Sequence, residues 1–133
     1  MRHLLLDTHT WVWTLANDER LSWRARDALM EAETVLVSTI SLFEIGQKVR
    51  LGKWPEMEPH WLELPKRLQQ QGGRFVPVSS EISLMAARLD WAHRDPFDRF
   101  IAATAITERL TLVSADAAFD DLRGMPGWHD RVW

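Results

Sequence analysis

The chain has 133 residues, no cysteine and a net charge of -3 at pH 7. The missing cysteine excludes disulfides, thiolate nucleophiles and zinc sites built on cysteine. The negative charge excludes a protein that coats nucleic acid through bulk charge, so nucleic-acid chemistry would depend on local arginines or bound metal.

The length fits one domain, because a chain of this size buries about two thirds of its unfolded surface. Residues 1–133 contain no linker or internal repeat that would divide them. The apolar run Leu4–Leu6 is too short for a signal peptide and ends on Asp7. No apolar run approaches the roughly 20 residues of a membrane span. We therefore expect a cytoplasmic protein without membrane contact.

The first element is a strand at residues 4–6, because a short apolar run bounded by a polar residue is typical of a strand buried on both faces. The spacing of apolar residues over 11–15 predicts a short helix. A second helix is expected over 23–33, with Ser22 as its cap. Residues 34–38 are β-branched and apolar, which predicts the second strand.

A third helix is expected to open at residues 38–41, run through 42–49 and end near 51–53. A fourth helix is expected over 60–71. Pro65 should kink the fourth helix or split it in two. The third strand, at 75–78, contains Pro77 and therefore belongs at an edge of the sheet.

A fifth helix starts at Ser80, and a sixth at the Asp95-Pro96 pair, since proline is favoured at the first helical position after an aspartate cap. The fourth strand is expected at 110–114 and a last one at 131–133. Strands that alternate with helices through short loops predict a doubly wound α/β fold, with a mostly parallel central sheet of four to five strands.

Four carboxylates occupy comparable places: Asp7 and Asp116 follow strands, and Glu44 and Asp98 lie early in helices. Each alone has a structural explanation as a cap, a capping-box partner or a turn residue. Because the segments after parallel strands emerge at one edge, however, the four should converge. Gathered carboxylates repel each other unless a cation joins them, and Mg²⁺ or Mn²⁺ prefers oxygen ligands. The pattern predicts a metal-dependent phosphoryl-transfer site.

Four parts of the chain also match the pattern of a known family: residues 5–9, 41–45 with 51–53, 93–103, and 112–116. The Asp-Pro-Phe-Asp-Arg stretch at 95–99 is the most specific of them. Through these motifs the chain resembles the PIN-domain ribonucleases, and among them the VapC-like toxins of bacterial toxin–antitoxin pairs. His9 departs from the pattern, since many relatives carry asparagine there.

The resemblance implies a PIN-like three-layer α/β/α sandwich formed by residues 1–133 as a single domain. It also implies a Mg²⁺- or Mn²⁺-dependent endoribonuclease, in which a metal-activated water hydrolyses RNA phosphodiesters. The implied catalytic and metal-binding residues are Asp7, Glu44, Asp98 and Asp116. The implied partners are an RNA substrate, a cognate antitoxin protein and a second copy of the chain.

Four further residues are candidates to support the acids. The hydroxyls of Thr8 and Ser114 are placed to orient carboxylates. Asp95 fits a helix cap better than a metal ligand. Arg99 flanks the acids and is expected to contact RNA phosphate or pair with the cluster. We assign no catalytic role to His93, because a bound metal already activates water.

Two other interpretations compete with the nuclease. A signalling receiver domain needs a phosphoacceptor aspartate after strand three, where the sequence reads Val78-Ser79-Ser80. A catalytically silent PIN module would bind RNA or a partner protein without cutting, and a metal titration would distinguish it from the nuclease.

The chain contains eight tryptophans and no tyrosine. Most of the tryptophans are expected in the core. Four of them are candidates for an exposed apolar groove that takes a partner helix, although core burial is favoured for them too: Trp11, Trp13, Trp54 and Trp61.

Overall fold

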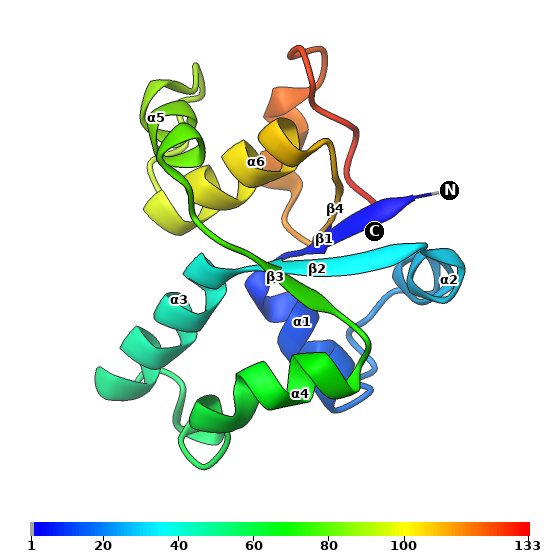
Figure 1. Ribbon diagram of the computed structural model, residues 1–133, viewed down its shortest axis with the longest axis vertical. Helices are drawn as coiled ribbons and strands as arrows, with labels where there is room; N and C mark the ends of the chain where they lie inside the picture. Colours follow the sequence, from blue (N-terminus) through cyan, green and yellow to red (C-terminus); the bar gives the residue numbers. More distant parts are fainter. Residues whose placement is uncertain (1) are drawn as a thin grey trace.

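The computed structural model describes residues 2–133. At its centre lies a four-stranded sheet, parallel throughout, in the order β3-β2-β1-β4 (Figure 1). The strands are β1 (His3–Leu6), β2 (Thr34–Ser38), β3 (Arg74–Val76) and β4 (Thr111–Val113). The order confirms the predicted edge position of the third strand, which ends just before Pro77.

Helices cover both faces of this sheet (Figure 1). The α-helices are α1 (Thr8–Leu15), α2 (Trp23–Glu31), α3 (Thr39–Arg50), α4 (Leu64–Gln70), α5 (Ser80–Arg88) and α6 (Pro96–Glu108). Short 3₁₀ helices are η1 (Pro55–Met57), η2 (Trp61–Glu63) and η3 (Ala117–Leu122). The predicted three-layer α/β fold is confirmed. Among residues 2–133, no helix has the length and apolar character needed to span a membrane.

The leucines of β1 belong to both hydrophobic cores, one on each face of the sheet. Leu5 packs toward α5 and α6, whereas Leu4 and Leu6 pack toward α1, α3 and α4, because successive side chains alternate across a sheet. All three leucines are almost completely buried, and each such burial contributes about 1.5–3 kcal/mol. The predicted strand buried on both faces is therefore confirmed.

The third helix begins at Thr39, within the predicted opening at residues 38–41, because the Ser38 hydroxyl accepts the N–H of Ile40 and caps the helix. One predicted boundary needs correction. The second helix ends at Glu31 rather than at residue 33, since the backbone turns extended at the next position. The predicted break at Pro65 is confirmed, because η2 ends and α4 starts immediately before it.

The predicted last strand is only a single bridge. Val132 pairs in parallel with Val113, and its N–H donates to the Leu112 carbonyl at 2.9 Å. The Ser114 N–H in turn donates to the Val132 carbonyl at 3.2 Å. These two bonds hold the C-terminal segment along β4, next to the carboxyl edge of the sheet.

Candidate active site

The four predicted acids line one cavity of about 280 Å³ at the carboxyl edge of the sheet. We call it the acidic cavity, and its carboxylates are Asp7, Glu44, Asp95, Asp98 and Asp116. Asp7 follows β1, Glu44 lies one turn into α3, and Asp98 lies in the first turn of α6. Asp116 caps η3. The predicted convergence therefore occurs, although several of these acids also serve local helix starts.

Asp7 is held by two hydrogen bonds, one to each oxygen. The Thr8 N–H donates to Oδ1 at 2.8 Å, and the Ser114 hydroxyl donates to Oδ2 at 2.6 Å. Burial raises the pKa of Asp7 to about 7, the Ser114 bond opposes this rise, and the charge of Asp98 adds to it. Asp7 is thus a carboxyl group that is protonated in part at neutral pH unless a cation approaches.

Asp98 is paired with a histidine from the loop before α6. Its Oδ2 lies 2.7 Å from Nε2 of His93. Burial raises the pKa of Asp98 to about 6; the His93 bond lowers it, and the charges of Asp95 and Asp116 raise it. One ligand atom each from His93, Asp98 and Asp116 lie within 4.8 Å of one another, a grouping able to hold a metal ion.

His93 is the site residue that sequence reasoning missed. A signal was present, because it lies five positions before Asp98 in the same matching segment. The spacing alone does not reveal the contact, since residues 89–95 form no helix or strand. The geometry makes His93 a hydrogen-bond partner of the acid rather than a free base.

Glu44 is buried and has both carboxylate oxygens occupied. The Thr8 hydroxyl donates to Oε1 at 2.7 Å, and Lys48 Nζ donates to Oε2 at 2.8 Å. Thr8 therefore does orient a carboxylate through its hydroxyl. Lys48 lies 5.6 Å from the centre of the Trp54 ring, which stacks on His9. The positively charged partner of Glu44 is therefore Lys48, a side chain of the protein itself.

Arg99 does not point at the acids. Its guanidinium donates to four main-chain carbonyls, those of Ala86, Leu89, Trp91 and His93, at 2.6–3.0 Å. The expected pairing of Arg99 with the acids is not present among the described residues, because its guanidinium donors bond carbonyls at the end of α5 and in the loop beyond it. A contact of Arg99 with RNA stays a prediction. Arg99 acts on the site by fixing the loop that carries His93.

Asp95 is the cap of α6, as predicted. Its Oδ1 accepts the N–H groups of Phe97 at 2.9 Å and Asp98 at 3.5 Å. Asp116 has a similar local role, because its Oδ1 accepts the Ala118 N–H at 2.9 Å. Within residues 2–133, Oδ2 of Asp116 and Oδ1 of Asp98 accept no hydrogen bond and remain free for another ligand.

The four tryptophans that we grouped together do not form one groove. Trp11 is completely buried, and its indole N–H donates to Gln71 at 3.0 Å. Trp13 and Trp54 line a cavity of about 510 Å³ beside α1 and α4. Trp61 lines a different one against α3. Helical spacing alone did not separate the buried indole from the half-buried ones.

The fold and the site together define a class of protein: a parallel α/β sheet whose carboxyl edge carries a cavity of carboxylates. The family model of the PIN domain matches residues 4–125. Ribonuclease VapC22 of Mycobacterium tuberculosis is 34% identical over 122 residues, which cover 87% of this chain and 88% of that protein. The chain belongs to the PIN-domain family, and within it to the VapC group.

Solved structures agree with this fold. VapBC-5 of Mycobacterium tuberculosis, described as a member of the VapBC family of toxin–antitoxin systems, superposes with a TM-score of 0.67 at 19% identity over 98% of each chain. FitAcB of Neisseria gonorrhoeae gives a TM-score of 0.58 at 25% identity, over 86% of this chain and 88% of that one.

Proposed function

We propose that this chain is a divalent-metal-dependent endoribonuclease and the toxin of a toxin–antitoxin pair, acting in the cytoplasm. The acidic cavity carries the proposal, because it collects Asp7, Glu44, Asp98 and Asp116 in one place. Membership of the VapC group and the likeness to Ribonuclease VapC22 supply the substrate class, RNA.

The residues of the acidic cavity fit a hard divalent ion. The free oxygens of Asp98 and Asp116 provide ligands of the kind that Mg²⁺ and Mn²⁺ prefer. Asp7, with its pKa raised to about 7 by burial, would be returned to its charged form by a nearby cation. We therefore propose Asp7, Asp98 and Asp116 as the residues that hold the metal, with Glu44 adjoining them.

When bound, Mg²⁺ or Mn²⁺ supplies Lewis acidity, which activates water and offsets charge on the phosphodiester. The side chains of this protein set the geometry. Ser114 fixes one oxygen of Asp7, and His93 fixes one oxygen of Asp98. Lys48 is the only lysine or arginine among the described residues that line the acidic cavity, and it is therefore the side chain placed to face a phosphate oxygen.

The test is cleavage of a mixed RNA pool by the purified chain, free of antitoxin, in Mn²⁺. We expect cutting that stops in EDTA and falls by about 10²-fold in Asp98→Asn, which keeps the size of the side chain but removes its negative charge and one carboxylate oxygen. Asp130→Asn, an exposed aspartate outside the acidic cavity, is the matched control. Cutting that survives the loss of Asp98 would contradict the proposed site.

The silent-module alternative makes a different prediction for the same samples. A silent module would leave RNA intact in every condition and show no Mn²⁺ binding that depends on Asp98, as measured by calorimetry. The free ligand oxygens of Asp98 and Asp116 favour the nuclease over this alternative.

The proposal includes two protein partners, an antitoxin and a second copy of the chain. The antitoxin is supported by solved relatives described as a toxin–antitoxin complex and as a member of a toxin–antitoxin family. Light scattering of the purified chain should give twice the mass of 15.5 kDa. A single-copy mass at all concentrations would remove the homodimer from the proposal without affecting the nuclease.

A further inference from the structure

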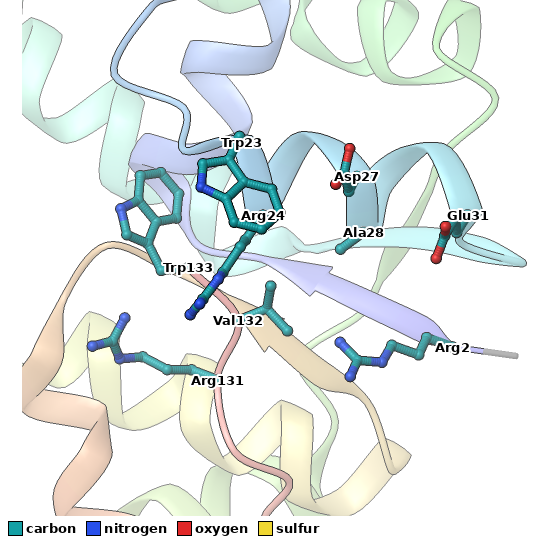
Figure 2. A pocket seen from close by; sticks show the side chains of 9 residues that line it. All are labelled: Arg2, Trp23, Arg24, Asp27, Ala28, Glu31, Arg131, Val132 and Trp133. Carbon is teal, nitrogen blue, oxygen red and sulfur yellow. The ribbon is translucent and has the colours of Figure 1, made fainter.

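Another cavity, of about 580 Å³, lies between α2, the start of β1 and the C-terminal segment (Figure 2). Arginines and tryptophans dominate its walls, so we call it the Arg–Trp cavity: Arg2, Trp23, Arg24, Arg131 and Trp133. It shares no lining residue with the acidic cavity. The proposed cleavage chemistry does not use it.

The aromatic wall of this cavity is unusually open. Trp23 is 68% exposed, although tryptophan is a residue that folding normally buries. The guanidinium of Arg24 lies 5.3 Å from the centre of the Trp23 ring. In Figure 2, Trp23 and Trp133 lie at the same end of the cavity, and the Arg24 side chain extends from α2 toward the C-terminal segment. Two indole rings, those of Trp23 and Trp133, therefore lie with the Arg24 guanidinium at one end of the Arg–Trp cavity.

The charges around the cavity are distributed unevenly. Of the acids on its α2 wall, Glu31 lies at the end of the cavity away from the tryptophans in Figure 2, and Asp27 lies between, one helical turn from Trp23. Arg131 is already engaged, since it donates to Asp120 and to the Ser114 carbonyl. Arg24 contacts the Trp23 ring but makes no hydrogen bond or ion pair within residues 2–133. The Arg2 side chain also has no such bond within residues 2–133, but in Figure 2 it lies at the opposite end of the cavity, so Arg24 is the cation available to an anion beside the tryptophans.

A run of aromatic contacts joins the two cavities. The Trp133 ring lies 5.7 Å from that of Trp13, and Trp13 lies 6.2 Å from His9. Both Trp13 and His9 line the acidic cavity. A polymer that leaves the acidic cavity along this run reaches Trp133 first and then Arg24 and Trp23.

We propose that the Arg–Trp cavity is a subsite for single-stranded RNA, which takes the nucleotides beyond those in the acidic cavity; this rests on the proposed ribonuclease function. Bases stack on Trp133 and Trp23, and a backbone phosphate pairs with Arg24. Aromatic platforms interleaved with cations are how proteins hold single strands without reading their sequence. An acidic peptide would use the arginine but leave the open indole faces without a matching partner.

The test measures binding apart from cutting. A fluorescein-labelled, mixed-sequence RNA of about twelve nucleotides is titrated with the full chain in EDTA, and its anisotropy is recorded. We expect Trp23→Ala and Arg24→Glu each to weaken binding about tenfold, and Trp23→Phe to retain most of it. Arg24→Glu should also lower the slope of affinity against salt by about one or more, as expected when a phosphate contact is lost.

Two control variants separate the subsite from bulk effects. Met30→Ala removes an 85% exposed side chain from the same helix, and Arg88→Glu makes the same charge change on α5. Both should bind within about twofold of the unaltered chain, because neither residue lines the Arg–Trp cavity. Melting curves of all variants check that each is folded.

The outcomes distinguish this inference from the proposed function. If the unaltered chain cuts RNA but Trp23→Ala and Arg24→Glu bind it normally, the subsite is wrong and the nuclease stands. Equal weakening by Arg24→Glu and Arg88→Glu also overturns the subsite. Tighter binding of a poly-glutamate peptide than of RNA would make the cavity a protein site. If the unaltered chain neither binds nor cuts RNA, both proposals fall.

Discussion

The carboxylates on the two sides of the acidic cavity differ in whether a positively charged side chain of the protein is bonded to them. On the α3 side, Glu44 has both oxygens bonded, and Lys48 supplies a cation at 2.8 Å. On the β1–α6 side, Asp7 and Asp98 have hydroxyl, N–H and imidazole partners, but no lysine or arginine of the described chain pairs with them. Burial accordingly raises the pKa of both aspartates.

This difference indicates where a metal would act. A carboxylate that already has an internal cation gains little from a second one, whereas two aspartates with raised pKa values gain the most. Glu44 is then chiefly a residue that holds Lys48 at the cavity wall, and Asp7 and Asp98 are the acids that need the ion. Breaking each half separately should therefore produce different results.

The largest stability effect is expected from Asp7→Asn in metal-free protein. The folded chain keeps the Asp7 proton up to about pH 7, whereas an ordinary aspartate releases it near 3.8. The folded state binds more protons between these values, so the free energy of unfolding must fall as pH rises through them. The shift is about three pKa units, and at about 1.4 kcal/mol per unit the loss is on the order of 4 kcal/mol.

Urea unfolding in EDTA at a series of pH values between about 4 and 8 measures this loss. Asp7→Asn should remove most of the slope and be more stable than the unaltered chain at the alkaline end. Asp130→Asn, outside the acidic cavity, should leave the slope unchanged. Added Mn²⁺ should restore the stability of the unaltered chain. A steeper slope in Asp7→Asn would contradict the assigned charge balance.

On the α3 side, stability is expected to fall when the positive charge beside Glu44 is removed, rather than when a carboxylate loses its proton. Lys48→Met leaves Glu44 buried without its cation, and we expect a loss of about 1–3 kcal/mol, because the lysine is partly exposed and solvent screens the pair. Glu44→Gln in addition should recover much of that loss. A double-mutant cycle by urea unfolding gives the coupling energy. Additive losses would show that the pair is not the stabilising contact.

Chain order and strand topology predicted much of the acidic cavity. Asp7 follows β1 and Asp116 follows β4, and parallel pairing brings these ends together whatever the side chains do. The cap role of Asp95 was predictable from the proline after it. These features depend on the direction of the strands and on short local sequences, and both can be inferred from a single amino-acid sequence.

What escaped prediction depends on side-chain direction across loops. His93 meets Asp98 only because the stretch after α5 turns back, and Arg99 leaves the acids because four carbonyls compete for its donors. Similarly, Trp11 and Trp13 are two positions apart, and only packing against α4 and β3 decides which is buried. No local pattern contains this information.

The smallest predicted effect concerns Arg99, which controls the histidine without touching an acid. Arg99→Lys keeps the charge but provides a single ammonium where the guanidinium reaches four carbonyls. We expect a loss of stability of about 1 kcal/mol and a fall in Mn²⁺ affinity of about tenfold, because His93 no longer fixes Asp98. Urea unfolding and calorimetry measure the two quantities.

Amide hydrogen exchange tests whether the losses of stability and Mn²⁺ affinity in Arg99→Lys come from a looser loop at residues 89–95. Exchange should quicken at residues 89–95 in Arg99→Lys, because the carbonyls of that loop lose their shared donor. Lys66→Arg, the reverse exchange on α4, should change neither the stability nor the Mn²⁺ affinity. Unchanged Mn²⁺ affinity beside a quickened loop would show that the metal site does not depend on the position of His93.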